Sequence, residues 1–256
     1  MNGLAARALR GECLADVLII DFHVHLGSRW ATMNMPVADS EEMLRLARAV
    51  GVGKLVVNGC IWPDLRQAND MVAALARRHP GAVVGLATTN PYQHDMVAEA
   101  RRCLDELGMR GVKLHAMHQT AFAPRPLASY EREWQRLFAF LAERQAPVLY
   151  HGIVSEEMIR AWPEVPFVCA HGAGDTAGME KLAGYPNFHV DTAATQNPAW
   201  CVRQAVQILG AGRVLWGTDA PLDDFAQRLG VVLDSGLAEE DMLKVLGRNA
   251  ARLLRL

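Results

Sequence analysis

Eight short runs of apolar, often β-branched residues recur along the 256 residues of this chain, and longer stretches with helical periodicity separate them. The runs are almost continuously hydrophobic, which is typical of parallel strands covered on both faces rather than of a half-exposed antiparallel sheet. Strands are therefore predicted at residues 17–22, 54–58, 82–87, 111–115, 147–150, 166–170, 187–191 and 213–217.

Helix signals fill the intervals between these strands. The clearest helix begins after Asp39, a capping residue, and ends before Gly51, a glycine stop. Met43, Leu44 and Ala47 give it an apolar stripe. Further helices are predicted over residues 64–79, 93–107, 127–145, 155–162, 175–184, 198–210, 222–235 and 239–247.

Eight strand–helix units in about 250 residues predict a (β/α)8 TIM barrel, whose active site forms at the carboxyl ends of the strands. An open, doubly wound parallel sheet alternates the same elements, and local pattern alone does not exclude it. No Ser/Gly-rich linker or low-complexity tract divides the series. We therefore expect one α/β barrel domain over residues 1–256.

Composition restricts the partners of such a barrel. Lysine and arginine number 26 against 28 aspartates and glutamates, so no excess of positive charge attracts nucleic acid. The five cysteines are odd in number and far apart, which argues against a disulfide framework. No apolar run is long enough to span a membrane, and no export signal is visible. We expect a cytoplasmic protein with a small-molecule substrate and no nucleic-acid or membrane partner; whether it forms a homo-oligomer stays open.

Histidines and aspartates stand at the carboxyl ends of six predicted strands. His23 and His25 are two positions apart in an extended segment, so both imidazoles project from one face and together suit one divalent ion. A lone His-x-His tripeptide also occurs by chance, as two solvated or core histidines. Its position at the end of the first strand favours a metal site, because further candidates follow at later strand ends: His115, His151, His171, His189, Asp191 and Asp219.

These strand ends fall in recognisable segments: Asp-Phe-His-Val-His, Gly-Val-Lys-Leu-His, Leu-Tyr-His-Gly, Cys-Ala-His-Gly, His-Val-Asp-Thr and Leu-Trp-Gly-Thr-Asp-Ala-Pro. In this order they resemble the amidohydrolase superfamily, in its branch of metal-dependent hydrolases related to amino-carboxymuconate-semialdehyde decarboxylase. The resemblance covers almost the whole chain. It implies that His23, His25, His151 and Asp219 hold the metal, and that His171 contacts the metal-bound water or the substrate, or binds a second ion.

Imidazole and carboxylate ligands suit Zn²⁺, with Mn²⁺, Fe²⁺ and Co²⁺ as competitors. Such an ion lowers the pKa of a bound water toward about 7. Asp219 and His171 are the expected catalytic residues, and either suits the role of general base. We expect one Zn²⁺ ion, although a second ion stays open.

Two roles are open for Lys113. In two-metal members of the superfamily a lysine on the fourth strand is carboxylated and bridges the ions, whereas an unmodified lysine would contact the substrate. We expect one metal ion, and we expect Lys113, His115 and His118 to bind substrate, since this cationic group suits a carboxylate or a phosphate.

The leading expectation is a hydrolase that attacks an amide, ester or lactone with metal-activated water. The alternative keeps the site and makes it a non-oxidative decarboxylase of a carboxylated substrate. A resemblance to the TatD-type deoxyribonucleases is weaker, because the expected glutamate segment reads Gly-Val-Lys-Leu-His here. A binding or scaffold barrel with a vestigial site would not need the complete set of ligands.

Overall fold

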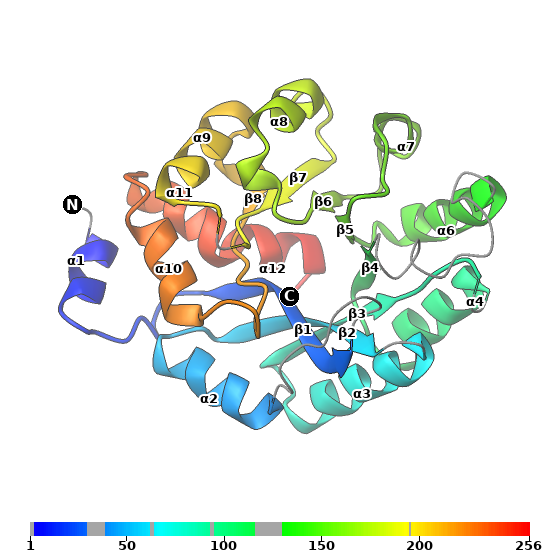
Figure 1. Ribbon diagram of the computed structural model, residues 1–256, viewed down its shortest axis with the longest axis horizontal. Coiled ribbons are helices and arrows are strands. Elements are labelled where there is room, and N and C mark those ends of the chain that lie inside the picture. Colours follow the sequence, from blue (N-terminus) through cyan, green and yellow to red (C-terminus); the bar gives the residue numbers. More distant parts are fainter. Residues whose placement is uncertain (1–2, 30–38, 62–63, 93–94, 116–129, 195) are drawn as a thin grey trace.

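Eight parallel strands stand in chain order in the computed structural model, and helices surround them (Figure 1). The structure describes the chain apart from residues 1–2, 30–38, 62–63, 93–94, 116–129 and 195. The strands are β1 Ile20–Arg29, β2 Lys54–Ile61, β3 Val83–Thr88, β4 Gly111–His115, β5 Val148–His151, β6 Phe167–Cys169, β7 Phe188–Asp191 and β8 Val214–Leu215. The predicted (β/α)8 barrel is confirmed.

A helix follows each strand within the described residues. The helices are α1 Gly3–Leu9, α2 Ser40–Ala49, α3 Leu65–Arg78, α4 Met96–Arg101, α6 Glu131–Arg144, α7 Glu156–Ala161, α8 Thr176–Leu182, α9 Ala199–Leu209, α10 Phe225–Leu233, α11 Glu239–Leu243 and α12 Asn249–Leu254. Asp39 caps α2 as the sequence predicts and accepts the backbone N–H groups of Glu41 and Glu42. Short 3-10 turns and two π-helical segments complete the series.

Main-chain hydrogen bonds also bring the last strand against the first. The Phe22 N–H donates to the Trp216 carbonyl at 3.0 Å, and the His25 N–H donates to the Ala220 carbonyl at 2.8 Å. The Asp219 N–H in turn donates to the His23 carbonyl at 2.8 Å. The chain segments after β8 and along β1 therefore form the seam of the barrel, and their backbones are fixed against each other.

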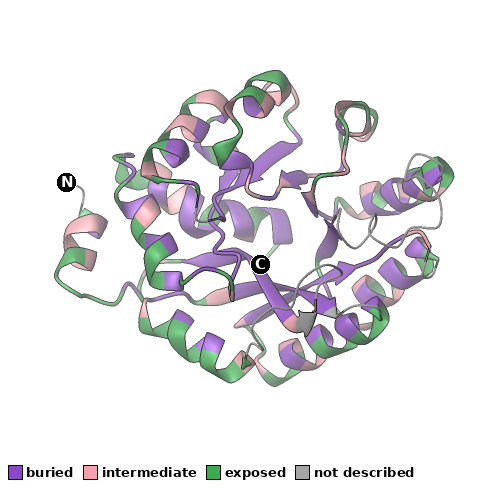
Figure 2. Ribbon diagram, in the orientation of Figure 1, coloured by how far each residue is buried: buried purple, intermediate pink, exposed green. Residues whose placement is uncertain are grey.

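Two apolar clusters lie on opposite sides of the strands. The larger packs the strands against the surrounding helices, so each helix buries its inner face and exposes its outer face (Figure 2). The smaller fills the barrel interior, where residues of α12 close the amino-terminal end of the strands. Its members are Ile20, Phe22, Val56, Val84, Leu86, Leu149, Val168, Ala170, Leu215, Ala250, Leu253 and Leu254.

The structure corrects two boundaries. The first strand was predicted at residues 17–22, but β1 runs over Ile20–Arg29 because its polar end hydrogen-bonds to both neighbouring segments. The last helix was predicted to end at residue 247, but helical backbone continues to Leu254, where it packs into the barrel interior. None of the described helices combines the length and the apolar character needed to cross a membrane.

Candidate metal centre

A bulge in β1 sets the direction of the His-x-His pair. The pairing register with β2 shifts between Asp21 and Val24. Phe22 belongs to the interior cluster, whereas Val24 belongs to the outer one. His23 and His25 therefore both face into the barrel, above its apolar interior.

Asp21 supports this bulge from inside the seam. Its carboxylate accepts the backbone N–H groups of His23 and Thr218, both at 3.0 Å, and the Thr218 hydroxyl at 2.6 Å. Burial raises the pKa of Asp21 to about 7. Asp21 thus binds backbone groups rather than an imidazole ring, and it holds β1 against the segment that carries Asp219.

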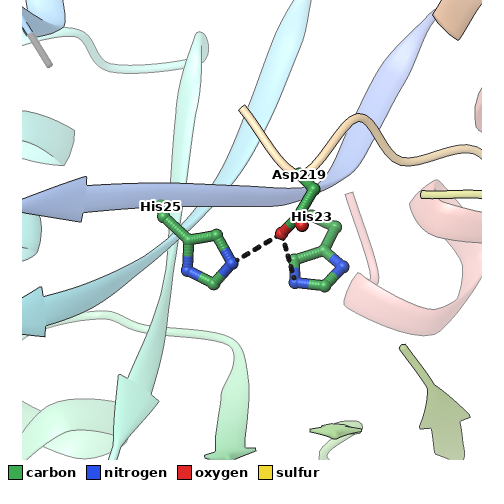
Figure 3. Close-up of side chains that lie close together, drawn as sticks. All are labelled: His23, His25 and Asp219. Atoms are coloured by element: carbon green, nitrogen blue, oxygen red, sulfur yellow. Dashed lines mark hydrogen bonds and ion pairs between the residues drawn. The ribbon is translucent and has the colours of Figure 1, made fainter. Parts of the chain in front are cut away.

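Asp219 places its carboxylate between the two imidazoles of β1 (Figure 3). Its Oδ1 lies 2.8 Å from His25 Nε2 and 3.4 Å from His23 Nε2. The Asp219 backbone is left-handed, with φ of 72°, and the His171 backbone is also left-handed, with φ of 61°. Non-glycine residues rarely adopt this conformation. The backbone that directs these two side chains is therefore energetically unfavourable.

The chemistry of this donor set fits a divalent cation. The ligand atoms of His23, His25 and Asp219 all lie within 4.8 Å of one another, and all three residues are buried. Burial lowers the pKa of both histidines, so their rings are neutral at pH 7 and retain a lone pair. Burial by itself would raise the pKa of Asp219, but the adjacent imidazoles bring it below its usual range. Neutral imidazoles and an ionised carboxylate are the usual ligands of Zn²⁺ and related ions.

Lys113 approaches the same cluster from β4. Its side chain is wholly buried, and Nζ lies 2.8 Å from His23 Nε2. Burial lowers the pKa of Lys113 to about 8, which leaves the side chain mainly protonated at pH 7. A cation thus contacts the lone pair that a metal ion at His23 would use.

Three further imidazoles lie side by side across the barrel. His115 and His151 are register partners on β4 and β5, with His115 Nε2 3.1 Å from His151 Nδ1. The His151 ring centre lies 4.9 Å from that of His171, which in turn lies 5.1 Å from that of His23. Burial and the charge of Lys113 lower the pKa of His151 to about 4, so this ring is also neutral at pH 7.

A family model described as Amidohydrolase matches residues 20–256. The chain belongs to the amidohydrolase family. A search of curated proteins found no match to this amidohydrolase.

Solved structures share the fold of this amidohydrolase. A 2,6-dihydroxybenzoate decarboxylase from Rhizobium is 16% identical, with 93% of this chain and 99% of that chain covered and a TM-score of 0.73. A dihydroxybenzoic acid decarboxylase from Polaromonas sp. JS666, solved with manganese and 2-nitroresorcinol, is 17% identical, with 94% and 97% covered and a TM-score of 0.75. A Pseudomonas putida protein provisionally named a 2-pyrone-4,6-dicarboxylic acid hydrolase is 20% identical, with 93% and 98% covered and a TM-score of 0.71.

The predicted site residues of this amidohydrolase divide into three groups. His23, His25 and Asp219 come together as one candidate cation site. His151 falls outside that trio among the described residues, so its role as a fourth ligand stays a prediction. The substrate contacts predicted at Lys113 and His115 lie beside the site, and His118 lies outside the described residues.

Two buried side chains at the site were given no individual role by the sequence: Asn58 was not singled out, and Asp191 was one strand-end candidate among several. Asn58 of β2 donates from Nδ2 to the Val24 carbonyl at 3.0 Å, beside His25. Asp191 of β7 lies 2.8 Å from His23 Nδ1. Both stand at the carboxyl end of a predicted strand, and that position was the available signal.

Proposed function

We propose that this amidohydrolase is a metal-dependent, non-oxidative decarboxylase of a small carboxylated substrate. The observation that carries the proposal is the buried ammonium of Lys113 beside the candidate metal ligands. Two carboxylates, Asp191 and Asp219, face this ammonium, and a divalent ion at the site would leave one net positive charge. Such a site favours an anionic substrate.

Each site residue has its own role in this proposed reaction. His23, His25 and Asp219 would hold the ion, with His151 as the predicted fourth ligand. The bound ion would supply Lewis-acid polarisation of a substrate oxygen. Lys113 binds and orients the substrate carboxylate. When the bond from the substrate carbon to this carboxylate breaks, carbon dioxide leaves and the electron pair stays on carbon. His171 then donates a proton to that carbon.

The metal identity belongs to the same proposal. The ligand types suit Zn²⁺ as the sequence predicts, and the Polaromonas decarboxylase was solved with manganese. Both ions are therefore the first to test. The decarboxylases among the structural relatives support this reaction more than they support hydrolysis.

Hydrolysis of an ester or lactone is the second candidate, favoured by the fold shared with the Pseudomonas putida protein. In that reaction Asp219 or His171 would take a proton from the attacking water. The same donor set serves both reactions, so product analysis must separate them.

The test is to load metal-free protein with Mn²⁺ or Zn²⁺ and to incubate it with hydroxybenzoates and with a pyrone dicarboxylate. We expect release of carbon dioxide equal to the substrate consumed, loss of turnover on chelation and recovery when the ion is restored. Incorporation of heavy oxygen from water into the product, without carbon dioxide, would instead establish the hydrolase. Turnover that persists after full chelation would contradict the metal-dependent mechanism.

A further inference from the structure

Asp191 connects three parts of the site through one buried carboxylate. Its side chain is fully inaccessible to solvent at the end of β7. Oδ2 lies 2.8 Å from His23 Nδ1, a residue 168 positions away in the chain. Oδ1 accepts the backbone N–H of His171 at 2.7 Å and that of Ala193 at 3.1 Å. The carboxylate therefore contacts a predicted metal ligand on one side and fixes a loop backbone on the other.

Contacts on the two edges of the His23 ring agree on where its proton lies. Lys113 Nζ is 2.8 Å from Nε2, nearer than Asp219 Oδ1 at 3.4 Å, and an ammonium only donates hydrogen bonds, so Nε2 carries the lone pair. The single proton of the neutral ring then lies on Nδ1. An ionised carboxylate only accepts, and Asp191 Oδ2 is placed to accept that proton's hydrogen bond.

We infer that Asp191 is a positioning residue, which holds the His23 proton on Nδ1 and so keeps Nε2 available to bind a divalent ion. A histidine that binds a metal through one nitrogen usually donates its other N–H to such a partner, which fixes the ring and makes it a better ligand. The same carboxylate holds the left-handed backbone of His171 in place. This role rests on the proposed metal site but requires no particular reaction.

Direct ligation by Asp191 is the competing arrangement. The ligand atoms of His23, His171 and Asp191 also lie within 4.8 Å of one another. However, both carboxylate oxygens of Asp191 already have ring or backbone N–H partners. An ion bound to Oδ2 would compete with the hydrogen bond from the His23 ring, whereas a supporting role preserves all three bonds.

Replacement of Asp191 by asparagine separates the supporting role from direct ligation. The side chain keeps its size and shape, and one acceptor oxygen becomes an NH2 donor. In Asp191→Asn the amide oxygen still accepts the N–H groups of His171 and Ala193. The amide nitrogen then faces His23 Nδ1 and donates to it, which favours the ring proton on Nε2, where it displaces the hydrogen bond from Lys113. In the opposite amide orientation the side-chain NH2 of Asp191→Asn would face the backbone N–H groups of His171 and Ala193. Donors would then face donors, so this orientation is less favourable.

The experiment uses the whole 256-residue chain and two readouts that do not involve turnover. Nitrogen NMR of labelled histidines in the metal-free protein reports which ring nitrogen of His23 is protonated, with the signal assigned by its absence in His23→Gln. Calorimetric titration with Zn²⁺ and Mn²⁺ reports affinity. In wild type we expect the proton on Nδ1. In Asp191→Asn we expect it on Nε2, with metal affinity lower by about 10- to 100-fold and an unchanged circular dichroism spectrum.

Asp21→Asn is the matched control, since Asp21 is an equally buried carboxylate that contacts backbone and hydroxyl groups but no imidazole. We expect it to leave the His23 proton on Nδ1. A wild-type His23 protonated on Nε2 would overturn the inference even if Asp191→Asn failed to fold. So would an Asp191→Asn protein with the proton still on Nδ1 and wild-type affinity. A direct ligand role would appear as lost metal binding with the proton still on Nδ1.

Discussion

His25 Nε2 and Asp219 Oδ1 lie 2.8 Å apart although 194 positions separate the two residues in the chain. The barrel seam produces this contact, because main-chain bonds of the same two segments join β1 to the residues after β8. The candidate metal site and the closure of the barrel therefore depend on one stretch of backbone. Changes that weaken the seam should lower metal affinity as well as stability.

Loss of one ligand should abolish tight metal binding. We expect His25→Gln to weaken Zn²⁺ or Mn²⁺ binding by more than the about 10- to 100-fold that loss of a supporting hydrogen bond costs. Metal content after dialysis and calorimetric titration measure it. His79→Gln is the control, because His79 is the partly exposed C-cap of α3 and its ring pairs with Glu41 rather than with a site residue. Equal metal content in both variants would contradict the assignment.

Removal of the Lys113 charge should raise the affinity for the metal ion and lower the affinity for the substrate. The ammonium contacts His23 Nε2, and a hydrogen bond to a charged group is worth about 1.5–3 kcal/mol. We therefore expect Lys113→Met to bind the ion about tenfold more tightly, while the KM for a carboxylated substrate rises. Lys181→Met, which removes an exposed lysine, should change neither value.

The opposite result for Lys113→Met is informative. Weaker metal binding, together with a dependence on bicarbonate in the wild type that the variant lacks, would show that Lys113 is a carboxylated ligand. The site would then bind a second ion.

The metal-free protein should lose stability in mild acid. Burial lowers the pKa of His189 to about 4, below the value of about 6.5 of an exposed histidine. Between these two values the unfolded chain binds more protons than the folded one, so the stabilisation is complete above about pH 6.5 and declines as the pH falls toward 4. His151 shifts in the same direction.

Urea unfolding at about pH 7.5 and about pH 5 measures this effect. We expect His189→Met to reduce the difference between the two pH values by about 1–2 kcal/mol. An identical pH dependence in the variant would mean that His189 does not titrate in this range when the protein unfolds.

The interior face of α12 should contribute strongly to stability. Leu254 is 2% exposed and packs with the interior cluster, so Leu254→Ala should cost about 2–5 kcal/mol in the free energy of unfolding. Leu256 is 50% exposed, and Leu256→Ala should stay within about 0.5 kcal/mol of wild type. Denaturant unfolding compares the two variants. A similar small effect in both would mean that α12 does not support the barrel.

The strand ends could be predicted from the sequence because parallel strands with helical returns bring all their carboxyl ends to one rim. That rule correctly places His23, His25 and Asp219 together. It could not predict the bulge in β1. Strict alternation from Ile20 and Phe22 would turn His23 outward, and the register shift that corrects this depends on hydrogen bonds to distant segments.

The partner of His23 was missed for a related reason. Asp191 was visible as a polar residue at a strand end, but so were several others, and which of them reaches a given ring nitrogen depends on distances across the barrel. The helical turns after residue 247 were missed because the predicted helix was assigned from its local pattern. Only the filled interior of the barrel explains why the apolar residues Leu253 and Leu254 continue it.

The left-handed backbones of His171 and Asp219 have a practical consequence for protein engineering. Glycine fits that conformation without steric cost, so selection for heat resistance alone would not protect either residue from replacement. A thermostable variant obtained in this way would keep the barrel and lose two side chains that the proposed reaction uses. Any such selection on this protein should therefore include a requirement for metal binding in every round.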